Sequence, residues 1–178
     1  YLRSRRDKAN PFFLYVALPA PHTPWLPTKP FQKRTNNMYT DFVAMVDDTV
    51  GQILKALDKN DLARDTLVLF TSDNGPWLSY GDHAGTTAGL REGKGTTFEG
   101  GVRVPCIARW PGTIPPGRVS GVHWMTIDVL PTIAALIDAP LPDQTIDDRD
   151  ATWLLWSRVP LRQRPGRAMT ERILATVL

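Results

Sequence analysis

Apolar and polar positions along the chain predict two buried strands with a helix between them. Continuous apolar runs at residues 11–18 (PFFLYVAL) and 67–70 (LVLF) predict strands that are covered on both faces. Between these runs, residues 40–57 place apolar side chains at helical spacing, with Thr40 or Asp41 as the N-cap. A strand, a helix and a second strand in this order predict a parallel sheet flanked by helices.

The pattern continues with a third strand and a second helix. Residues 102–110 (VRVPCIARW) predict a strand at a sheet edge or at a bulge, because Pro105 has no amide hydrogen to donate to a neighbouring strand. Residues 127–137 predict a short helix, with Asp128 near its start and Pro131 in its first turn. The predicted fold class is therefore α/β, in which ligands bind at the carboxyl ends of the strands.

Two loops follow the first two predicted strands at that end of the sheet. Residues 19–27 contain four prolines, which exclude a helix and a strand ladder and make the loop rigid and extended. Residues 75–101 are rich in glycine and are predicted to be loop-like. The two loops and the residues between the second strand and its loop should therefore share one rim of the sheet.

Length and charge restrict the classes of protein to which the chain can belong. Its 178 residues suit one domain. We assign that domain to residues 1–147 and interpret residues 148–178 as an arginine-rich tail with no clear place in the sheet. Residues 1–8 and 158–178 hold nine Lys or Arg against two Asp or Glu, whereas the remainder holds twelve against sixteen. The basic charge lies in the tails, so no nucleic-acid-binding face is predicted.

Three further features concern membrane spanning, the start of the chain and the tail. No apolar run is long enough to span a membrane, and the start at Tyr1, without Met or an apolar leader, leads us to expect a chain cut from something longer. Within the tail, residues 153–156 (WLLW) could form a short helix that packs on the core.

Polar side chains at the end of the second strand are the first candidates for chemistry. The Asp73 carboxylate and the Asn74 carboxamide are hard oxygen donors, which suit Ca²⁺ or Mg²⁺ better than a soft metal. Ser-Asp-Asn-Gly is also ordinary turn chemistry, so an Asx turn is an alternative interpretation of the same residues.

Two more candidates lie in the loops on that rim. Prolines on both sides of His22 hold its imidazole in place, as a catalytic or oxyanion-binding group requires; the alternative is a loop histidine that caps a backbone group. Glycines beside Lys94 let the backbone approach an anion closely; the alternative is a flexible hairpin with a solvent-facing lysine. With Asp73 and Asn74, these residues predict a site for a sulfate or phosphate ester.

Other reactive side chains receive lesser roles. His83 is interpreted as an outer contact to the substrate, and His123, which precedes a helix, as structural. Arg91 and Arg103 flank the glycine-framed lysine, and either can be structural. Cys106 is the single cysteine, so no internal disulfide can form, and its place in an apolar strand predicts a buried, unreactive thiol.

Four consecutive stretches resemble the sulfatase family, in the later part of the catalytic domain of arylsulfatases and of bacterial enzymes similar to N-acetylgalactosamine-6-sulfatase. They lie between residues 11 and 147 and read PFFLYVALPAPHTPWLP, TLVLFTSDNGPW, GLREGKGTTFEGGVRVPCIARWPGTIPPG and DVLPTIAAL. The resemblance implies an alkaline-phosphatase-like α/β fold, a bound Ca²⁺ (or Mg²⁺) with Asp73 and Asn74 as ligands, and hydrolysis of sulfate esters. It also implies that Lys94 contacts the sulfate oxygens and that His22 helps to protonate the departing alcohol.

The sequence departs from the family in the residues that would perform the nucleophilic attack. In the family the nucleophile is a formylglycine made from the cysteine of a C-x-[PA]-x-R motif, and this motif does not occur here, since Cys106 is followed by Ile-Ala-Arg-Trp. The family's early Asp-Asp metal pair and its first Lys-x-His sulfate contacts are also absent and would lie before Tyr1. We therefore expect a C-terminal portion of a sulfatase catalytic domain that is inactive alone.

Two other functions stay open on the sequence. One is a phosphoesterase or phosphotransferase on the same superfold, because a fold does not determine its chemistry. The other is a non-catalytic remnant or binding module that retains an anion pocket. The expected partner is a sulfated small molecule or glycan, without nucleic acid and without a membrane span, and no oligomeric state is indicated. The resemblance implies a periplasmic, extracellular or lysosomal location.

Overall fold

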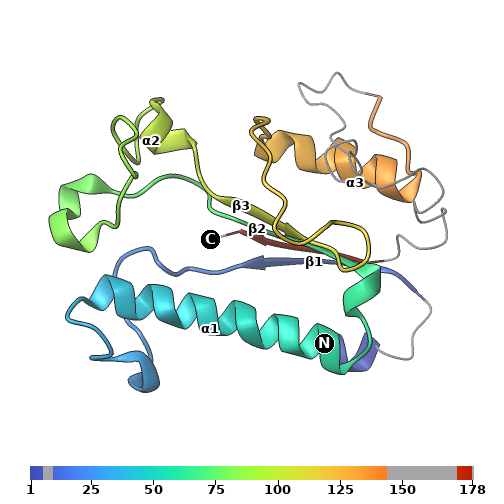
Figure 1. The fold of residues 1–178 in the computed structure, drawn as a ribbon, viewed down its shortest axis with the longest axis horizontal. Coiled ribbons are helices and arrows are strands. Elements are labelled where there is room, and N and C mark those ends of the chain that lie inside the picture. Colours follow the sequence, from blue (N-terminus) through green and yellow to red (C-terminus); the bar gives the residue numbers. More distant parts are fainter. Residues whose placement is uncertain (6–9, 144–171, 178) are drawn as a thin grey trace.

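A computed structural model describes residues 1–5, 10–143 and 172–177, and its centre is a four-stranded mixed sheet (Figure 1). The strand order is β1-β4-β2-β3. β4 pairs in parallel with both β1 and β2, whereas β3 pairs antiparallel with β2. The strands are β1 (Phe12–Ala17), β2 (Thr66–Thr71), β3 (Cys106–Arg109) and β4 (Arg172–Val177).

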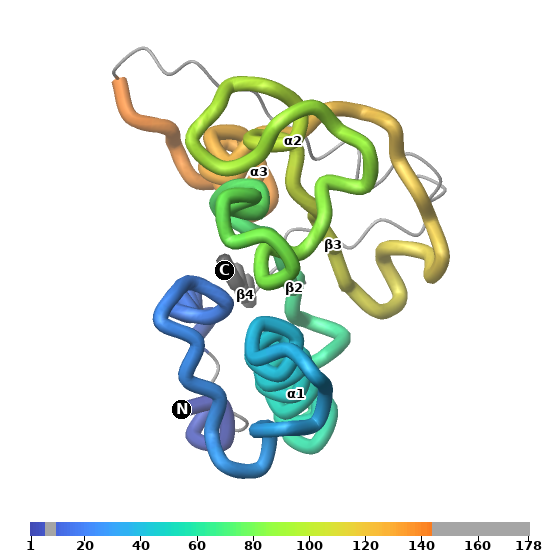
Figure 2. Tube along the Cα trace, turned by 90° about the vertical axis from the view of Figure 1, so that its left-hand side faces the viewer, coloured from blue at the N-terminus to red at the C-terminus, as the bar shows by residue number. Residues whose placement is uncertain are grey.

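Helices cover both faces of this sheet. α1 (Met38–Lys59) lies against one face and α3 (Val129–Ile137) against the other, as two perpendicular views show (Figures 1 and 2). α2 (Glu99–Val102) is a single turn, and short 3₁₀ turns occupy Leu2–Arg5, Lys29–Phe31, Ala63–Asp65, Leu78–His83 and Thr126–Asp128. None of the helices in the described part of the chain is both long and apolar enough to cross a membrane.

Alternation along β2 explains why this strand is buried on both faces, as predicted. Val68 points to the α1 side, where it packs in one cluster with Leu57 of α1. Leu67 and Leu69 point to the opposite side and pack with Leu136 of α3. Neighbouring strand residues face opposite ways, so two helices are needed to bury one continuous apolar run.

The prediction that residues 11–18 are buried on both faces is wrong. Phe12 is buried on the α1 side of β1, but Phe13 and Tyr15 on the other side are 57% and 55% exposed. β1 is an edge strand, and the buried cluster beneath α3 draws on β2 and β3 rather than on β1. An apolar run that reads as doubly buried is therefore covered on one face only.

The ends of the other elements also differ from the prediction. The edge position of β3 is confirmed, but the strand begins at Cys106 because Val102 closes α2. The statement that the tail has no place in the sheet is wrong for residues 172–177, which form the inner strand β4. The proposed helix at residues 153–156 lies outside the described residues.

The N-cap of α1 is Asn37, three residues before Thr40 and four before Asp41, the two predicted caps. Its side chain accepts hydrogen bonds from the amides of Tyr39 and Thr40. Asp41 is buried and has another role: its carboxylate accepts from the Lys33 amide and the Thr35 amide, each at 2.7 Å. The carboxylate therefore ties the turn before α1 to the first turn of the helix.

We predict that Asp41→Asn lowers the melting temperature at pH 7 and that this loss disappears in acid. Burial alone acts to raise the pKa of Asp41, but hydrogen bonds from Thr35 and from the amides of Lys33 and Arg34 outweigh it, so the pKa lies below its usual value. The ionised carboxylate therefore stabilises the fold fully above about pH 4, which is the pKa of Asp in an unfolded chain. This stabilisation is lost as the pH falls through the lower pKa that Asp41 has in the folded chain.

Thermal unfolding at pH 7 and in a series down to about pH 2 measures this difference. Asp47→Asn is the matched control, because Asp47 is exposed on the same helix. Equal melting temperatures of the Asp41→Asn variant and the unchanged chain at pH 7 would contradict the assigned role.

Candidate active site

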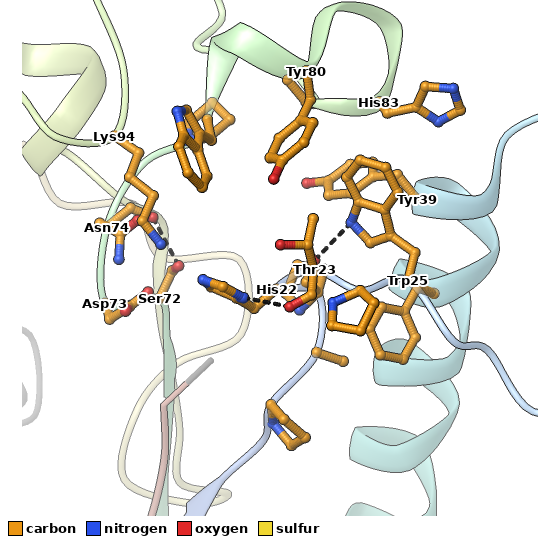
Figure 3. Close-up of a pocket in the computed structure, with 18 of the residues that line it drawn as sticks. His22, Thr23, Trp25, Tyr39, Ser72, Asp73, Asn74, Tyr80, His83 and Lys94 are labelled. Atoms are coloured by element: carbon orange, nitrogen blue, oxygen red, sulfur yellow. Dashed lines mark hydrogen bonds between the residues drawn. The ribbon is translucent and has the colours of Figure 1, made fainter.

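A cavity of about 660 Å³ lies at the carboxyl ends of β1 and β2. Segments that are distant in the sequence line it: the loop after β1, the start of α1, the residues after β2, the turn at Leu78–His83 and Lys94. All the residues assigned to the site from the sequence lie in its wall, and Figure 3 shows Asp73, Asn74 and Lys94 on the side opposite Trp25 and His83. The assigned residues are His22, Asp73, Asn74, His83 and Lys94.

Asp73 and Asn74 follow β2 directly, in a turn that other groups hold in place. The Ser72 hydroxyl donates to the Asn74 carbonyl at 2.9 Å, and the Gly75 amide donates to the Gly101 carbonyl at 2.9 Å. Within the described residues no hydrogen bond involves either the Asp73 carboxylate or the Asn74 carboxamide. An Asx turn would engage one of these side chains, so the structure does not support that alternative.

The loop after β1 presents the His22 imidazole with a defined tautomer. Its Nδ1 lies 2.7 Å from the Thr23 carbonyl oxygen, which can only accept, so Nδ1 carries a hydrogen. Two hydrogen bonds of 3.1 Å hold the loop: the His22 amide donates to the Pro19 carbonyl, and the Trp25 indole N–H donates to the Pro21 carbonyl. The exposed ring therefore offers Nε2 to a ligand in the cavity.

Lys94 reaches the cavity from a segment that is bound to the end of β2. Its amide donates to the Pro76 carbonyl at 2.9 Å, and its ammonium lies 5.9 Å from the centre of the Trp77 ring. The half-buried stem and the ammonium are directed to the same side as Ser72 and Asn74 (Figure 3). The ammonium is the only Lys or Arg charge among the lining residues of this cavity in the described chain.

Close backbone contacts explain several of the glycines around Lys94, whereas Gly95 has open space beside it and a left-handed φ of +89°. A Cβ on Gly75 would lie 1.8 Å from the Gly100 carbonyl oxygen, and one on Gly93 would lie 2.4 Å from that of Pro76. A Cβ on Gly100 would lie 1.9 Å from the Glu92 carbonyl oxygen. No side chain fits at these contacts, so the alternative of a loose hairpin does not describe this segment.

The aromatic side of the cavity was not predicted. Trp25 stacks on His83 with the ring centres 5.3 Å apart, and Tyr80 meets Trp25 edge-on at 5.1 Å. His83 is also fixed by a 3.1 Å hydrogen bond between Nδ1 and the Asn37 side chain. The sequence carried one signal for this wall, since Trp25 and Trp77 stand within three residues of candidate site residues.

Three of the lesser candidates, Arg91, Arg103 and His123, lie outside the cavity wall. The Arg91 guanidinium stacks on Phe98 at 3.7 Å, and Arg103 pairs with Glu99 at 3.2 Å on the surface. His123 is exposed and is not among the lining residues. These contacts are consistent with structural roles for both arginines.

The prediction that Cys106 is buried is wrong, because its residue is exposed at the start of the edge strand β3. The protein atoms beside the thiol still desolvate it, which raises its pKa. A raised pKa disfavours the thiolate that nucleophilic attack requires. The absence of a nucleophilic role for Cys106 stays a prediction.

The donor chemistry at the end of β2 fits a hard cation, but the number of donors does not complete a site. A carboxylate and a carboxamide are ligands typical of Ca²⁺, which takes six to eight oxygens. No group of three or more His, Cys, Asp or Glu side chains in the described residues is arranged to hold a metal ion. Asp73 and Asn74 therefore suit Ca²⁺ as two members of a larger ligand set.

Comparisons with protein-family models and with curated proteins both match this chain to sulfatases. The family model described as Sulfatase matches residues 1–139. Steryl-sulfatase of Mus musculus is 44% identical over 158 residues, which is 85% of this chain and 25% of that protein. Arylsulfatase A of Homo sapiens is 43% identical over 152 residues, which is 85% of this chain and 29% of that protein. The chain thus spans between a quarter and three-tenths of these two relatives.

Solved structures show the same likeness in three dimensions. A complex entitled Ps i-CgsB with k-i-k-neocarrahexaose superposes with a TM-score of 0.71 at 37% identity, over 79% of this chain and 32% of that chain. A glycosaminoglycan-metabolism protein of Bacteroides thetaiotaomicron, BT33336S-sulf, superposes with a TM-score of 0.77 at 30% identity, over 87% of this chain and 34% of that chain. The predicted α/β, alkaline-phosphatase-like fold is confirmed as a partial version of that architecture.

We predict that Gly75→Ala destabilises the chain by about 1–3 kcal/mol, because the new methyl group would force the Gly100 carbonyl away from the end of β2. Gly51→Ala is the matched control: a Cβ there meets nothing within 4 Å, and Gly51 lies inside α1. Alanine should stabilise that helix by about 0.5–1 kcal/mol. Chemical denaturation measures both, and equal effects of the two substitutions would refute the close contact.

Proposed function

Because the chain belongs to the sulfatase family, we propose that it forms one part of the active site of a sulfate-ester hydrolase. One observation carries the proposal. His22, Asp73, Asn74 and Lys94 come from three separate segments and line a single cavity at the carboxyl ends of β1 and β2. An ammonium, an imidazole and two hard oxygen donors suit the negatively charged, tetrahedral sulfate group of an ester and its cation.

Lys94 is proposed to bind the sulfate oxygens. Its ammonium is the single Lys or Arg charge in the described cavity wall, and the Pro76 contact holds its backbone beside Asp73 and Asn74. A fixed positive charge at the oxygens stabilises negative charge that develops there as the ester bond breaks.

His22 is proposed to act at the leaving oxygen. The Thr23 carbonyl holds the hydrogen on Nδ1, so Nε2 is the ring atom that meets the substrate. When protonated, Nε2 can donate its hydrogen to the departing alkoxide, which leaves as an alcohol. A rigid loop orients the ring without an ordering cost at each turnover.

The proposed reaction also needs a cation and a nucleophile, which Lys94 and His22 do not supply. Asp73 and Asn74 would hold a Ca²⁺ ion, which supplies positive charge next to the sulfate when it is bound. Formylglycine, made in the family from a C-x-[PA]-x-R cysteine, supplies the nucleophilic oxygen, and no such motif occurs in the 178 residues. We therefore infer that the chain by itself binds the ester without cleaving it.

We predict no turnover of 4-nitrophenyl sulfate by the 178-residue chain, with or without Ca²⁺, because the residue that would attack sulfur is missing. Release of 4-nitrophenolate, followed by absorbance, measures this directly. Turnover that disappears in Lys94→Ala would show that the cavity is catalytically complete and would overturn the inferred inactivity.

We predict that the chain binds inorganic sulfate and that Lys94→Ala weakens this binding about tenfold or more, since a charged hydrogen bond is lost. Lys55→Ala is the matched control, because it removes the same charge from an exposed position on α1 outside the cavity. Isothermal titration at constant ionic strength measures both. Equal losses in the two variants would mean that attraction is non-specific, and tighter binding of phosphate than of sulfate would favour a phosphoesterase.

A further inference from the structure

A continuous row of aromatic rings runs along the cavity away from the anion-binding residues. The Trp77 and Tyr80 ring centres are 5.0 Å apart and meet at 78°. Tyr80 and Trp25 follow at 5.1 Å and 73°, and Trp25 then stacks on His83. We call Trp77, Tyr80 and Trp25 the aromatic row; all three line the cavity.

The row begins beside the proposed sulfate anchor. The Lys94 ammonium is 5.9 Å from the centre of the Trp77 ring, at the first member of the row. In Figure 3 Lys94 and Asn74 lie on one side of the cavity, and Trp25 and His83 lie on the other, with Tyr80 between them. A sulfate held at Lys94 therefore directs the organic part of its ester along these rings.

The rings of the row are held in place but keep open surface. The indole N–H of Trp25 is satisfied by Pro21, and His83 covers one face of its ring. Trp77 and Tyr80 are 45% and 40% exposed, although they lie in a cavity wall. Large apolar surface left uncovered inside a cavity is a feature of ligand sites, where its burial contributes to affinity.

The charges of the described wall disfavour an occupant that carries a second anionic group. Lys94 is the only Lys or Arg of the described wall, and the sulfate is assigned to it. Beyond it, a second sulfate or a carboxylate would face the negative ring surfaces of the row, with no further Lys or Arg among the described lining residues to pair with. The alcohol part of the substrate should therefore be flat, apolar and uncharged.

We propose that the aromatic row is the alcohol-binding subsite and that it selects monosulfate esters of flat, apolar ring alcohols over sulfated sugars. This inference rests on the proposed function, because it takes Lys94 as the sulfate anchor. Stacking on an aromatic ring strengthens binding by about two- to tenfold beyond the effect of the buried area, so tight binding of the ring part depends on Tyr80 and Trp77.

The test compares three probes on the complete 178-residue chain by isothermal titration: inorganic sulfate, 2-naphthyl sulfate and galactose 6-sulfate. We expect 2-naphthyl sulfate to bind at least about tenfold more tightly than the other two. Tyr80→Ala should reduce the ratio of naphthyl sulfate to sulfate affinity about tenfold, whereas Tyr80→Phe, which keeps the ring, should preserve it. Trp77→Leu provides a second variant with the same expected loss.

Tyr15→Ala is the matched control, because Tyr15 is 55% exposed on β1 and lies outside the cavity wall. Three results would overturn the subsite while leaving Lys94-dependent sulfate binding intact. The ratio of naphthyl sulfate to sulfate affinity could be near one, it could be unaffected by both Tyr80→Ala and Trp77→Leu, or galactose 6-sulfate could bind equally tightly. Absence of Lys94-dependent binding of inorganic sulfate would instead reject the proposed function itself.

Discussion

The contact between the end of β2 and the glycine-rich segment that follows it is the constraint on which the site depends. A Cβ on Gly75 would collide with the Gly100 carbonyl oxygen, and a Cβ on Gly100 would collide with that of Glu92. Hydrogen bonds also join Gly75 to Gly101 and Lys94 to Pro76. Backbone-to-backbone packing of this kind is possible only without side chains. It brings a lysine that is twenty residues further along the chain beside the two oxygen donors at the strand end.

The cavity that results has two chemically different sides. One carries the ammonium, the imidazole and the two oxygen donors; the other is built from rings that pack on one another. A sulfate ester has the same division, since its charge lies on the sulfate and its alcohol can be apolar. The charged side accounts for the proposed reaction, and the aromatic side accounts for the proposed choice among esters.

In the described chain, Asp73 and Asn74 offer two oxygen donors, fewer than the six to eight that Ca²⁺ takes. Phe13 and Tyr15 are exposed on one face of β1. The chain spans 25% and 29% of two curated relatives. Whole-protein catalysis is therefore proposed, whereas membership of the family and the partial fold are established.

Local patterns in the sequence determined β2, α1, α3 and the polar residues at the strand end, because strand and helix periodicity and proline or glycine geometry act over a few residues. Only the tertiary structure decided that residues 172–177 enter the sheet, that one face of β1 is open, and that an aromatic row lies beside Lys94. Each of these depends on which distant segments pack together. Such contacts are set by the burial available across the whole fold, which no short stretch of residues encodes.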